Sequence, residues 1–303
     1  MAELTHSPSQ HPARLPDRVS GPPSGPPSGR FSLPPGVPAP PPEPTLVEFI
    51  GARVSAFLVH LGHISTIFFQ SMGAMFRRPL EFRAVAYQME SLGVRSVGIA
   101  SVTAVFIGMV MAVQFAFGLQ KFGGMEYTGR VVGLSFAREL APTLTAVIVG
   151  GRIGSGMTAE VGSMAVTEQI DAIYALGADP IKKLVVPRLI ASVLVLPVLA
   201  TFSLVLGFSG AMIVTATQFN VSAGFFLKTA LDTLTMGDFL SGVCKCPFFG
   251  AIIALVGCYF GLITHGGTEG VGRSTTRSVV VISITILIAD FFLTKIFMFI
   301  WSL

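Results

Sequence analysis

Charged residues are scarce in this sequence, and their scarcity excludes a soluble catalytic domain. Only 12% of the 303 residues are Asp, Glu, Lys or Arg, whereas a soluble domain has roughly a quarter. The mean hydropathy is +0.73. Apolar windows of about 20 residues recur, and each is long enough to cross a hydrocarbon layer of ~30 Å. We therefore predict an integral membrane protein.

Motifs that bind nucleotides, metals or nucleic acids are also missing. No Gly-x-x-x-x-Gly-Lys-Ser/Thr pattern occurs, so the chain has no P-loop for nucleotide phosphates. No Ser/His/Asp, Cys/His or metal-ligand cluster is readable either. We expect no enzyme activity and no cofactor bound by this chain. If ATP drives transport here, another polypeptide must hydrolyse it.

The net charge of +4 does not indicate nucleic-acid binding. The basic residues form no stripe with interleaved aromatics, as a nucleic-acid footprint requires; they lie in short clusters between apolar runs. Such clusters are typical of loops on the cytoplasmic side of a membrane. We exclude nucleic acid as a partner.

Cysteine is rare, and the three cysteines fall in one apolar segment. Cys244 and Cys246 are two positions apart on a predicted helix, so they point about 200° away from each other. With Cys258 they are predicted to be small packing residues. His60 and His63 lack further ligands and are interpreted as polar interfacial residues, so no metal site is predicted.

Proline is concentrated at the N-terminus. Residues 1–45 hold fourteen of the twenty prolines, a composition that favours extended, solvated chain. We predict a disordered cytoplasmic tail over 1–45 and a single membrane domain over 46–303.

The membrane domain is predicted to be all-α, with an interfacial helix followed by five spans. Residues 46–76 are amphipathic, which favours a helix lying in the interface plane. The five apolar runs that follow predict transmembrane helices over 96–119, 135–157, 184–217, 239–264 and 279–301.

The distribution of Lys and Arg predicts the orientation. Nine bases lie in the connections on one side and four on the other, and the richer side is cytoplasmic. The nine are Arg77, Arg78, Arg83, Arg95, Lys182, Lys183, Arg188, Arg273 and Arg277, and the four are Lys121, Arg130, Arg138 and Lys228. The N-terminus is therefore expected inside and the C-terminus outside.

The cytoplasmic segment 158–180 is predicted to be a helix that ends at Gly177 and Pro180. Its polar residues at spacings of three and four include Glu160, Glu168 and Asp171, which fall on one stripe. Two interpretations stay open on these residues alone: a surface on which a motor subunit pushes, or a solvated loop helix.

Several short motifs resemble the MlaE-type permease family, in order over about 48–303. They are Gly108-Met-Val-Met-Ala-Val-Gln114, Arg138-Glu-Leu-Ala-Pro142, Gly151-Arg-Ile-Gly-Ser155, Thr158-Ala-Glu-Val-Gly162, Thr167-Glu-Gln169, Asp179-Pro180, Gly272-Arg-Ser-Thr-Thr-Arg-Ser-Val-Val280 and Asp290-Phe-Phe-Leu-Thr294. The resemblance implies an ABC transporter permease subunit with an interfacial helix and five spans.

The same resemblance implies the partners and the cargo. The permease would act as a homodimer with two cytoplasmic ATPase subunits, which bind ATP and Mg²⁺, and with an MCE-domain lipid-binding protein on the periplasmic side. The cargo would be phospholipid or a related lipid moving between the inner and outer membranes. The location would be the bacterial inner membrane.

The resemblance also assigns the segment 158–180 as the coupling helix that docks on the ATPase. The candidate contacts are Glu160, Glu168, Gln169 and Asp171, together with Arg273 and Arg277 in the second inner loop.

Charged residues within the spans need partners, because each costs several kcal/mol when unpaired in a membrane. Arg138, Glu139, Lys245 and Asp290 are all expected in the outer half of the bundle. We predict one network that either lines the lipid path or pairs purely structurally.

A possible lipid path on the first span is formed by Phe106, Met109, Val110, Gln114 and Phe117, which alternatively face bulk lipid.

Two other function classes remain at this stage. One is an ion-gradient-driven transporter with Asp290 or Glu139 as proton carrier, although five unequal spans show no matching halves. The other is a non-transporting scaffold that recruits partners through the Pro-rich tail.

Overall fold

The computed structural model describes residues 46–75 and 81–302. The predicted tail over 1–45 lies outside the described residues. The chain divides into two units, Met1–Gly51 and Ala52–Leu303, and the second contains the helices discussed below except the first six residues of α1.

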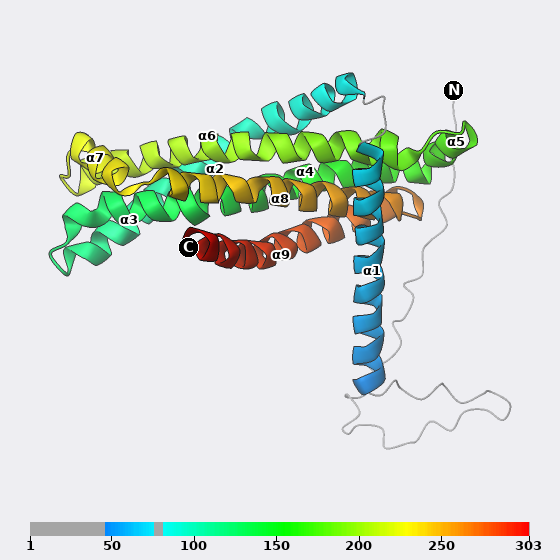
Figure 1. The fold of residues 1–303 in the computed structure, drawn as a ribbon, viewed down its shortest axis with the longest axis horizontal. Helices are drawn as coiled ribbons and strands as arrows, with labels where there is room; N and C mark the ends of the chain where they lie inside the picture. The colour runs from blue at the N-terminus through cyan, green and yellow to red at the C-terminus, as the bar shows by residue number, and fades with distance from the viewer. Residues whose placement is uncertain (1–45, 76–80, 303) are drawn as a thin grey trace, which may run out of the picture. The chain divides into compact units, whose positions relative to one another are not determined.

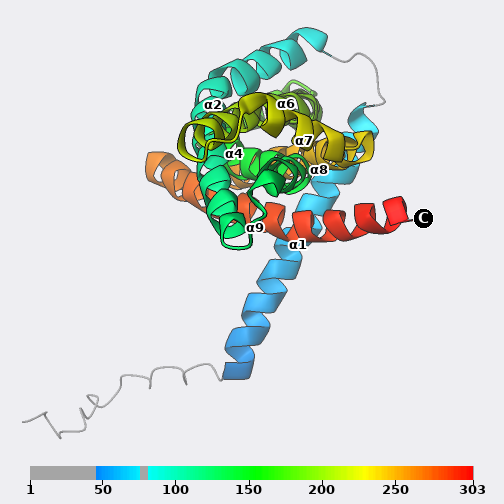
Figure 2. The same cartoon turned by 90° about the vertical axis from the view of Figure 1, so that its left-hand side faces the viewer.

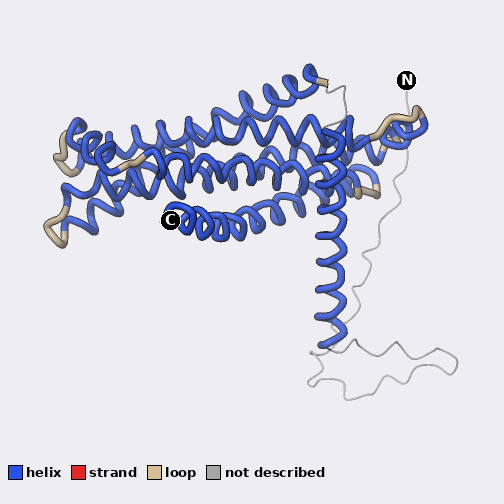
Figure 3. Tube along the Cα trace, in the orientation of Figure 1, coloured by secondary structure: helices blue, strands red, loops and turns tan. Residues whose placement is uncertain are grey.

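All the regular secondary structure of the described residues is helical, with short connections (Figure 3). The α-helices are α1 (Leu46–Met75), α2 (Phe82–Gln120), α3 (Thr128–Ser135), α4 (Ala141–Val166), α5 (Gln169–Ala175), α6 (Val186–Gln218), α7 (Ala223–Thr233), α8 (Met236–Leu262) and α9 (Gly267–Ser302). π-helical turns over Phe136–Leu140 and Ile181–Val185 lead into α4 and α6.

Five helical segments are long and apolar enough to cross a membrane, which confirms the predicted fold class. They are Phe82–Gln120, Met125–Val166, Ile181–Gln218, Met236–Leu262 and Gly267–Ile300. Each extends beyond at least one end of the corresponding predicted span. Hydropathy identifies only the apolar part of a helix, whereas the helical backbone hydrogen bonds continue into the polar residues beside that part. The membrane-interface position predicted for 46–76 stays a prediction, although α1 is helical.

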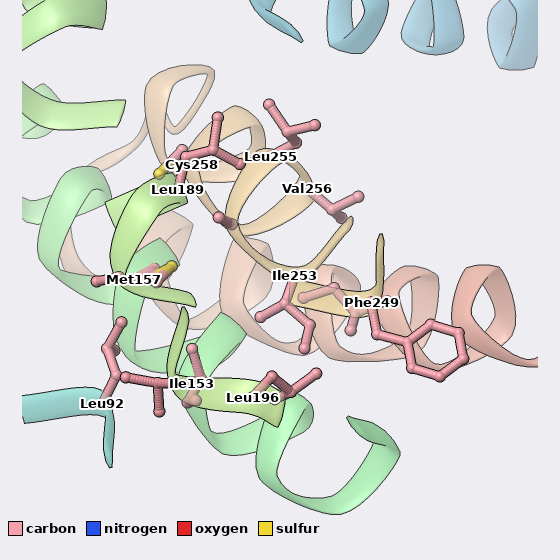
Figure 4. Close-up of a cluster of buried hydrophobic side chains, with 14 of the residues drawn as sticks. Leu92, Ile153, Met157, Leu189, Leu196, Phe249, Ile253, Leu255, Val256 and Cys258 are labelled. Atoms are coloured by element: carbon pink, nitrogen blue, oxygen red, sulfur yellow. The ribbon is translucent and has the colours of Figure 1, made fainter. Parts of the chain in front are cut away.

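Helices α2, α4, α6 and α8 run side by side, and α9 lies along α4 and α8 (Figures 1 and 2). Helices α3 and α7 pack together at one end of this group, and α5 lies at the other (Figure 1). The core between the helices contains Ile153, Leu196, Phe249 and Ile253, each at most 2% exposed (Figure 4). Cys258 is fully buried in the same cluster, where it packs as an apolar side chain.

Glycines bring α2 and α6 into backbone contact. A Cβ atom on Gly108 of α2 would lie 1.9 Å from the carbonyl oxygen of Gly207 on α6, a distance that no packing adjustment of a side chain relieves. Small residues at such crossings allow the close approach that drives helix association in membranes.

Replacing Gly108 with alanine is therefore expected to force α2 and α6 apart. We expect the free energy of unfolding to fall by about 2 kcal/mol, as for other overpacked sites, measured by SDS-induced unfolding of the purified protein. Gly98→Ala on the same helix is the matched control, because a Cβ atom at that position would have nothing within 4 Å. Equal stability of the two variants would contradict the close crossing.

Candidate functional site

A cluster of charged side chains lies where α4, α8 and α9 meet near the α3 end. The π-helical turn Phe136–Leu140 places Arg138 and Glu139 directly before α4. Lys245 projects from α8, and Asp290 and Thr294 lie one turn apart on α9. The structure thus brings together the four charged residues singled out in the sequence.

Lys245 is the centre of this cluster and is only 1% exposed. Its Nζ lies 2.6 Å from Glu139 Oε2 and 3.2 Å from Asp290 Oδ1. It also donates to Thr294 Oγ1 at 2.7 Å and to the Arg138 carbonyl oxygen at 3.3 Å. A buried ammonium group needs this density of acceptors, because desolvation otherwise exceeds the Coulombic gain of one ion pair.

Arg138 forms a second ion pair, with Asp238, and donates from Nε to Asp238 Oδ1 at 2.6 Å. Asp238 also caps α8, since its Oδ2 accepts from the Thr235 backbone N–H at 2.9 Å and Thr235 Oγ1 accepts from the Asp238 N–H. Asp238 is absent from the network predicted from the sequence. The spacing Thr235-x-x-Asp238 is a capping-box signal that marks the residue.

The cluster opens onto a cavity of about 220 Å³. Its walls include all of the cluster's charged residues except Asp290, together with Ser241, Phe297 and Met298. The side chains of Arg138 and Lys245 carry two positive charges against three negative charges on Glu139, Asp238 and Asp290. Polar groups and apolar walls therefore share one small cavity inside the membrane-spanning part of the chain.

The segment predicted as a single helix over 158–180 is interrupted, and that prediction was wrong in this respect. Helix α4 ends at Val166 and α5 begins at Gln169. Glu168 between them adopts φ +59°, a left-handed conformation that costs a non-glycine residue of order 1–3 kcal/mol. The burial of Ile170 in the core, at 8% exposure, holds the turn in place. Gly177, with φ +74°, ends the segment after α5 as predicted.

The candidate motor contacts are distributed over this turn and the start of α9. Glu168, Gln169 and Asp171 are exposed. Arg273 and Arg277 are exposed near the start of α9, and Arg273 pairs with Glu269 at 2.9 Å. Figure 1 shows α5 and the start of α9 at the same end of the helices.

Glu160 differs from the other candidates because its carboxylate is engaged inside the chain. Its Oε1 lies 2.8 Å from Arg188 Nη2. Arg188 is only 4% exposed, donates from Nη1 to the Leu184 carbonyl oxygen at 2.7 Å, and has no partner for Nε among the described residues. In the sequence, Arg188 counts only toward orientation, and no local signal indicates this ion pair between α4 and α6.

The candidate lipid-path residues lie on the outer face of α2. Phe106, Val110 and Phe117 are 63%, 56% and 57% exposed, Gln114 is exposed, and Met109 is half-buried. Their spacing of three and four places them on one side of the helix. They form a surface that faces away from the core.

One continuous helix connects the two polar regions. Helix α4 begins directly after the turn that holds Glu139 and ends directly before the turn at Glu168. Its 26 residues are about 39 Å long at 1.5 Å per residue. The helix therefore joins the turn at Glu168 to the charge cluster without interruption.

Five apolar helical segments, with a polar cluster within them and a polar turn at the end of one span, define a multi-pass membrane protein. The family model described as Permease MlaE matches residues 85–296. The chain belongs to the MlaE permease family.

Two of three relatives with similar sequences are named as probable ABC transporter permeases. The chain is 44% identical to a probable ABC transporter permease protein of Synechocystis over 207 residues, which cover 68% of this chain and 79% of the relative. It is 36% identical to a probable ABC transporter permease protein of Rickettsia conorii over 252 residues, covering 83% and 97%. It is 38% identical to the chloroplastic protein TRIGALACTOSYLDIACYLGLYCEROL 1 of Arabidopsis thaliana over 218 residues, covering 72% and 62%.

Proposed function

We propose that this chain is the membrane-spanning subunit of an ABC transporter that moves phospholipids or related lipids between the inner and outer membranes. Its membership of a permease family supports the transporter role. The name of the Arabidopsis relative refers to a galactolipid, which supports lipid as the cargo class. The lack of a P-loop in the sequence supports ATP hydrolysis, with its Mg²⁺, on a separate ATPase subunit.

The observation that carries the proposal is the continuity of α4 between the turn at Glu168 and the charge cluster. A motor subunit that contacts Glu168, Gln169 and Asp171 would act on one end of a rigid helix. The other end holds Arg138 and Glu139 beside the cavity. ATP-driven movement would thus reach a site in the membrane that combines charged groups with apolar walls.

The remaining features of the proposed assembly follow the family resemblance. The permease forms a homodimer in the bacterial inner membrane, with the N-terminus cytoplasmic and the C-terminus periplasmic. An MCE-domain lipid-binding protein receives or delivers the lipid on the periplasmic side. The orientation agrees with the excess of Lys and Arg in the connections at the α5 end.

Replacing Glu168 with lysine tests the contact with the motor. A motor surface that pairs with the acids of this turn would be basic, so a lysine at position 168 would create a like-charge contact, which costs several kcal/mol at an interface. We therefore expect ATP-dependent transfer of labelled phospholipid between vesicles to fall at least about tenfold, which corresponds to about 1.4 kcal/mol. The ATPase subunit is expected to co-purify less with this variant. Glu126→Lys is the matched control, because Glu126 is exposed at the opposite end of the helices.

Two outcomes would contradict the proposal. Lipid transfer that proceeds without ATP but requires a proton gradient would indicate the ion-driven class instead. Co-purification of an ATPase that is equally strong in the Glu168→Lys and wild-type proteins would remove the turn as the docking surface.

A further inference from the structure

Arg152 is a charged residue within a candidate span, and it has no acidic partner in the part of the chain that the structure describes. It lies on α4 within the segment Met125–Val166 and is exposed. Its Nη1 donates to Ser96 Oγ on α2 at 2.7 Å. Among the described residues, no carboxylate oxygen lies within 4.0 Å of a guanidinium nitrogen of Arg152.

Ser96 fixes the direction of the guanidinium group. Its side chain is fully buried, and its Oγ donates to the Leu92 carbonyl oxygen at 2.6 Å. The Ser96 hydroxyl is therefore an oriented acceptor for Arg152. An arginine has five N–H donors, and the structure gives a partner to one nitrogen of this side chain.

The position of Ser96 along α2 places the guanidinium near one surface of the bilayer. Residues 97–120 of α2 contain no charged side chain, and these 24 residues span about 36 Å at 1.5 Å per residue. A hydrocarbon layer is ~30 Å thick, so this stretch accounts for the whole layer. Ser96 and the exposed Arg95 lie at its end nearer to α5.

The surface beside the guanidinium is open. A Cβ atom on Gly156, one turn along α4 on the same face as Arg152, would have nothing within 4 Å. Because Arg152 itself is also exposed, a ligand can reach its guanidinium group from outside the helices. Arg95 adds a second positive charge near the same level.

We propose that Arg152, oriented by Ser96, binds the phosphate of a phospholipid in the leaflet on the α5 side. Phosphate is the abundant anion at this depth of a bilayer, and the planar guanidinium binds it in a bidentate manner. An unpaired arginine in this position is otherwise costly. The identification of the bound lipid as cargo rests on the proposed function. Binding of the lipid to Arg152 does not require transport.

Native mass spectrometry of the complete transporter released from nanodiscs tests this site without ATP. The nanodiscs contain equal amounts of dioleoyl-phosphatidylglycerol and dioleoylglycerol, which share acyl chains and differ in the phosphate. We expect the Arg152→Gln variant to retain at least fivefold less phosphatidylglycerol than wild type, with unchanged retention of dioleoylglycerol. Arg130→Gln, an exposed arginine at the opposite end, is the matched control. Excess inorganic phosphate is expected not to displace the lipid.

Variants that keep the charge make the result interpretable if Arg152→Gln does not fold. Arg152→Lys is expected to retain an intermediate amount of phosphatidylglycerol, because it keeps the charge but loses the bidentate geometry. Ser96→Ala is expected to weaken retention by a few fold, because the guanidinium loses its orienting acceptor.

Equal retention of phosphatidylglycerol in Arg152→Gln and Ser96→Ala, at the wild-type level, would overturn the proposal. So would displacement of the lipid by inorganic phosphate. Dissociation of the Arg152→Gln variant into single permease chains with unchanged lipid per chain would also overturn it, because the partner of Arg152 would then be a carboxylate of a second copy. Absence of ATP-driven lipid transfer by the wild-type transporter, with intact lipid retention, would count against the proposed function and leave this site standing.

Discussion

Replacing Lys245 with methionine is expected to lower the free energy of unfolding by about 3 to 5 kcal/mol, the range for removing one partner of a buried ion pair. Methionine fills a similar volume, so lost packing contributes little. The loss arises because Glu139 and Asp290, at 2.6 and 3.2 Å from Lys245 Nζ, become carboxylates without a counter-ion. SDS-induced unfolding of the purified protein measures the effect.

The double variant Lys245→Met with Asp290→Asn separates pairing from lost packing. If the pair is coupled, the double variant is more stable than the sum of the two single effects implies. Lys228→Met is the matched control, because Lys228 is exposed on α7. Additive effects of Lys245→Met and Asp290→Asn would show that the two residues do not act as a pair.

The same variants also test whether the charge cluster contacts the transported lipid. If the cluster only holds the helices together, the double variant recovers transport along with stability. If it also contacts cargo beside the cavity, transport stays low in a protein of recovered stability. Phospholipid transfer by the purified transporter distinguishes these two roles.

Replacing Glu160 with leucine is expected to cost about 3 kcal/mol of unfolding free energy, since it leaves a buried charge without its partner. Glu160 itself is half-exposed, with 54% of its side chain accessible, so its own desolvation contributes little. The cost arises from Arg188, which is 4% exposed and would remain buried without its counter-charge. The same unfolding measurement applies.

A second change on Arg188 identifies the cause. Adding Arg188→Met to Glu160→Leu is expected to recover much of the stability, because the buried charge is then removed with its partner. Asp171→Leu is the matched control, since Asp171 is an exposed acid on the adjacent α5. A protein in which Glu160→Leu and Asp171→Leu are equally harmless to stability would refute a stabilising ion pair between Glu160 and Arg188.

The number and nature of the membrane helices were predictable because a long apolar run has one stable state in a bilayer, a helix whose backbone hydrogen bonds are all satisfied internally. The ends were less predictable: α9 begins at Gly267, well before the predicted span at 279, because its polar first turns carry no hydropathy signal.

The turn at Glu168 shows where local sequence propensity reaches its limit. Its residues predict an uninterrupted helix, since a glutamate has no intrinsic preference for a left-handed conformation. The conformation is held because Ile170 is buried in the core, and this packing involves residues distant in the sequence. Local propensity yields to tertiary packing at this position.

By itself, the sequence determined that the chain is an all-helical membrane protein of a permease family and that a few charges in its spans need partners. Only the tertiary structure decided which partners they have: Asp238 for Arg138, Glu139 and Asp290 for Lys245, and Glu160 for Arg188. The physical reason is that the cost of an unpaired charge is a property of the residue and its depth, whereas pairing depends on how each helix is rotated and shifted against its neighbours. Contacts such as that of Gly108 with Gly207 set this rotation and shift.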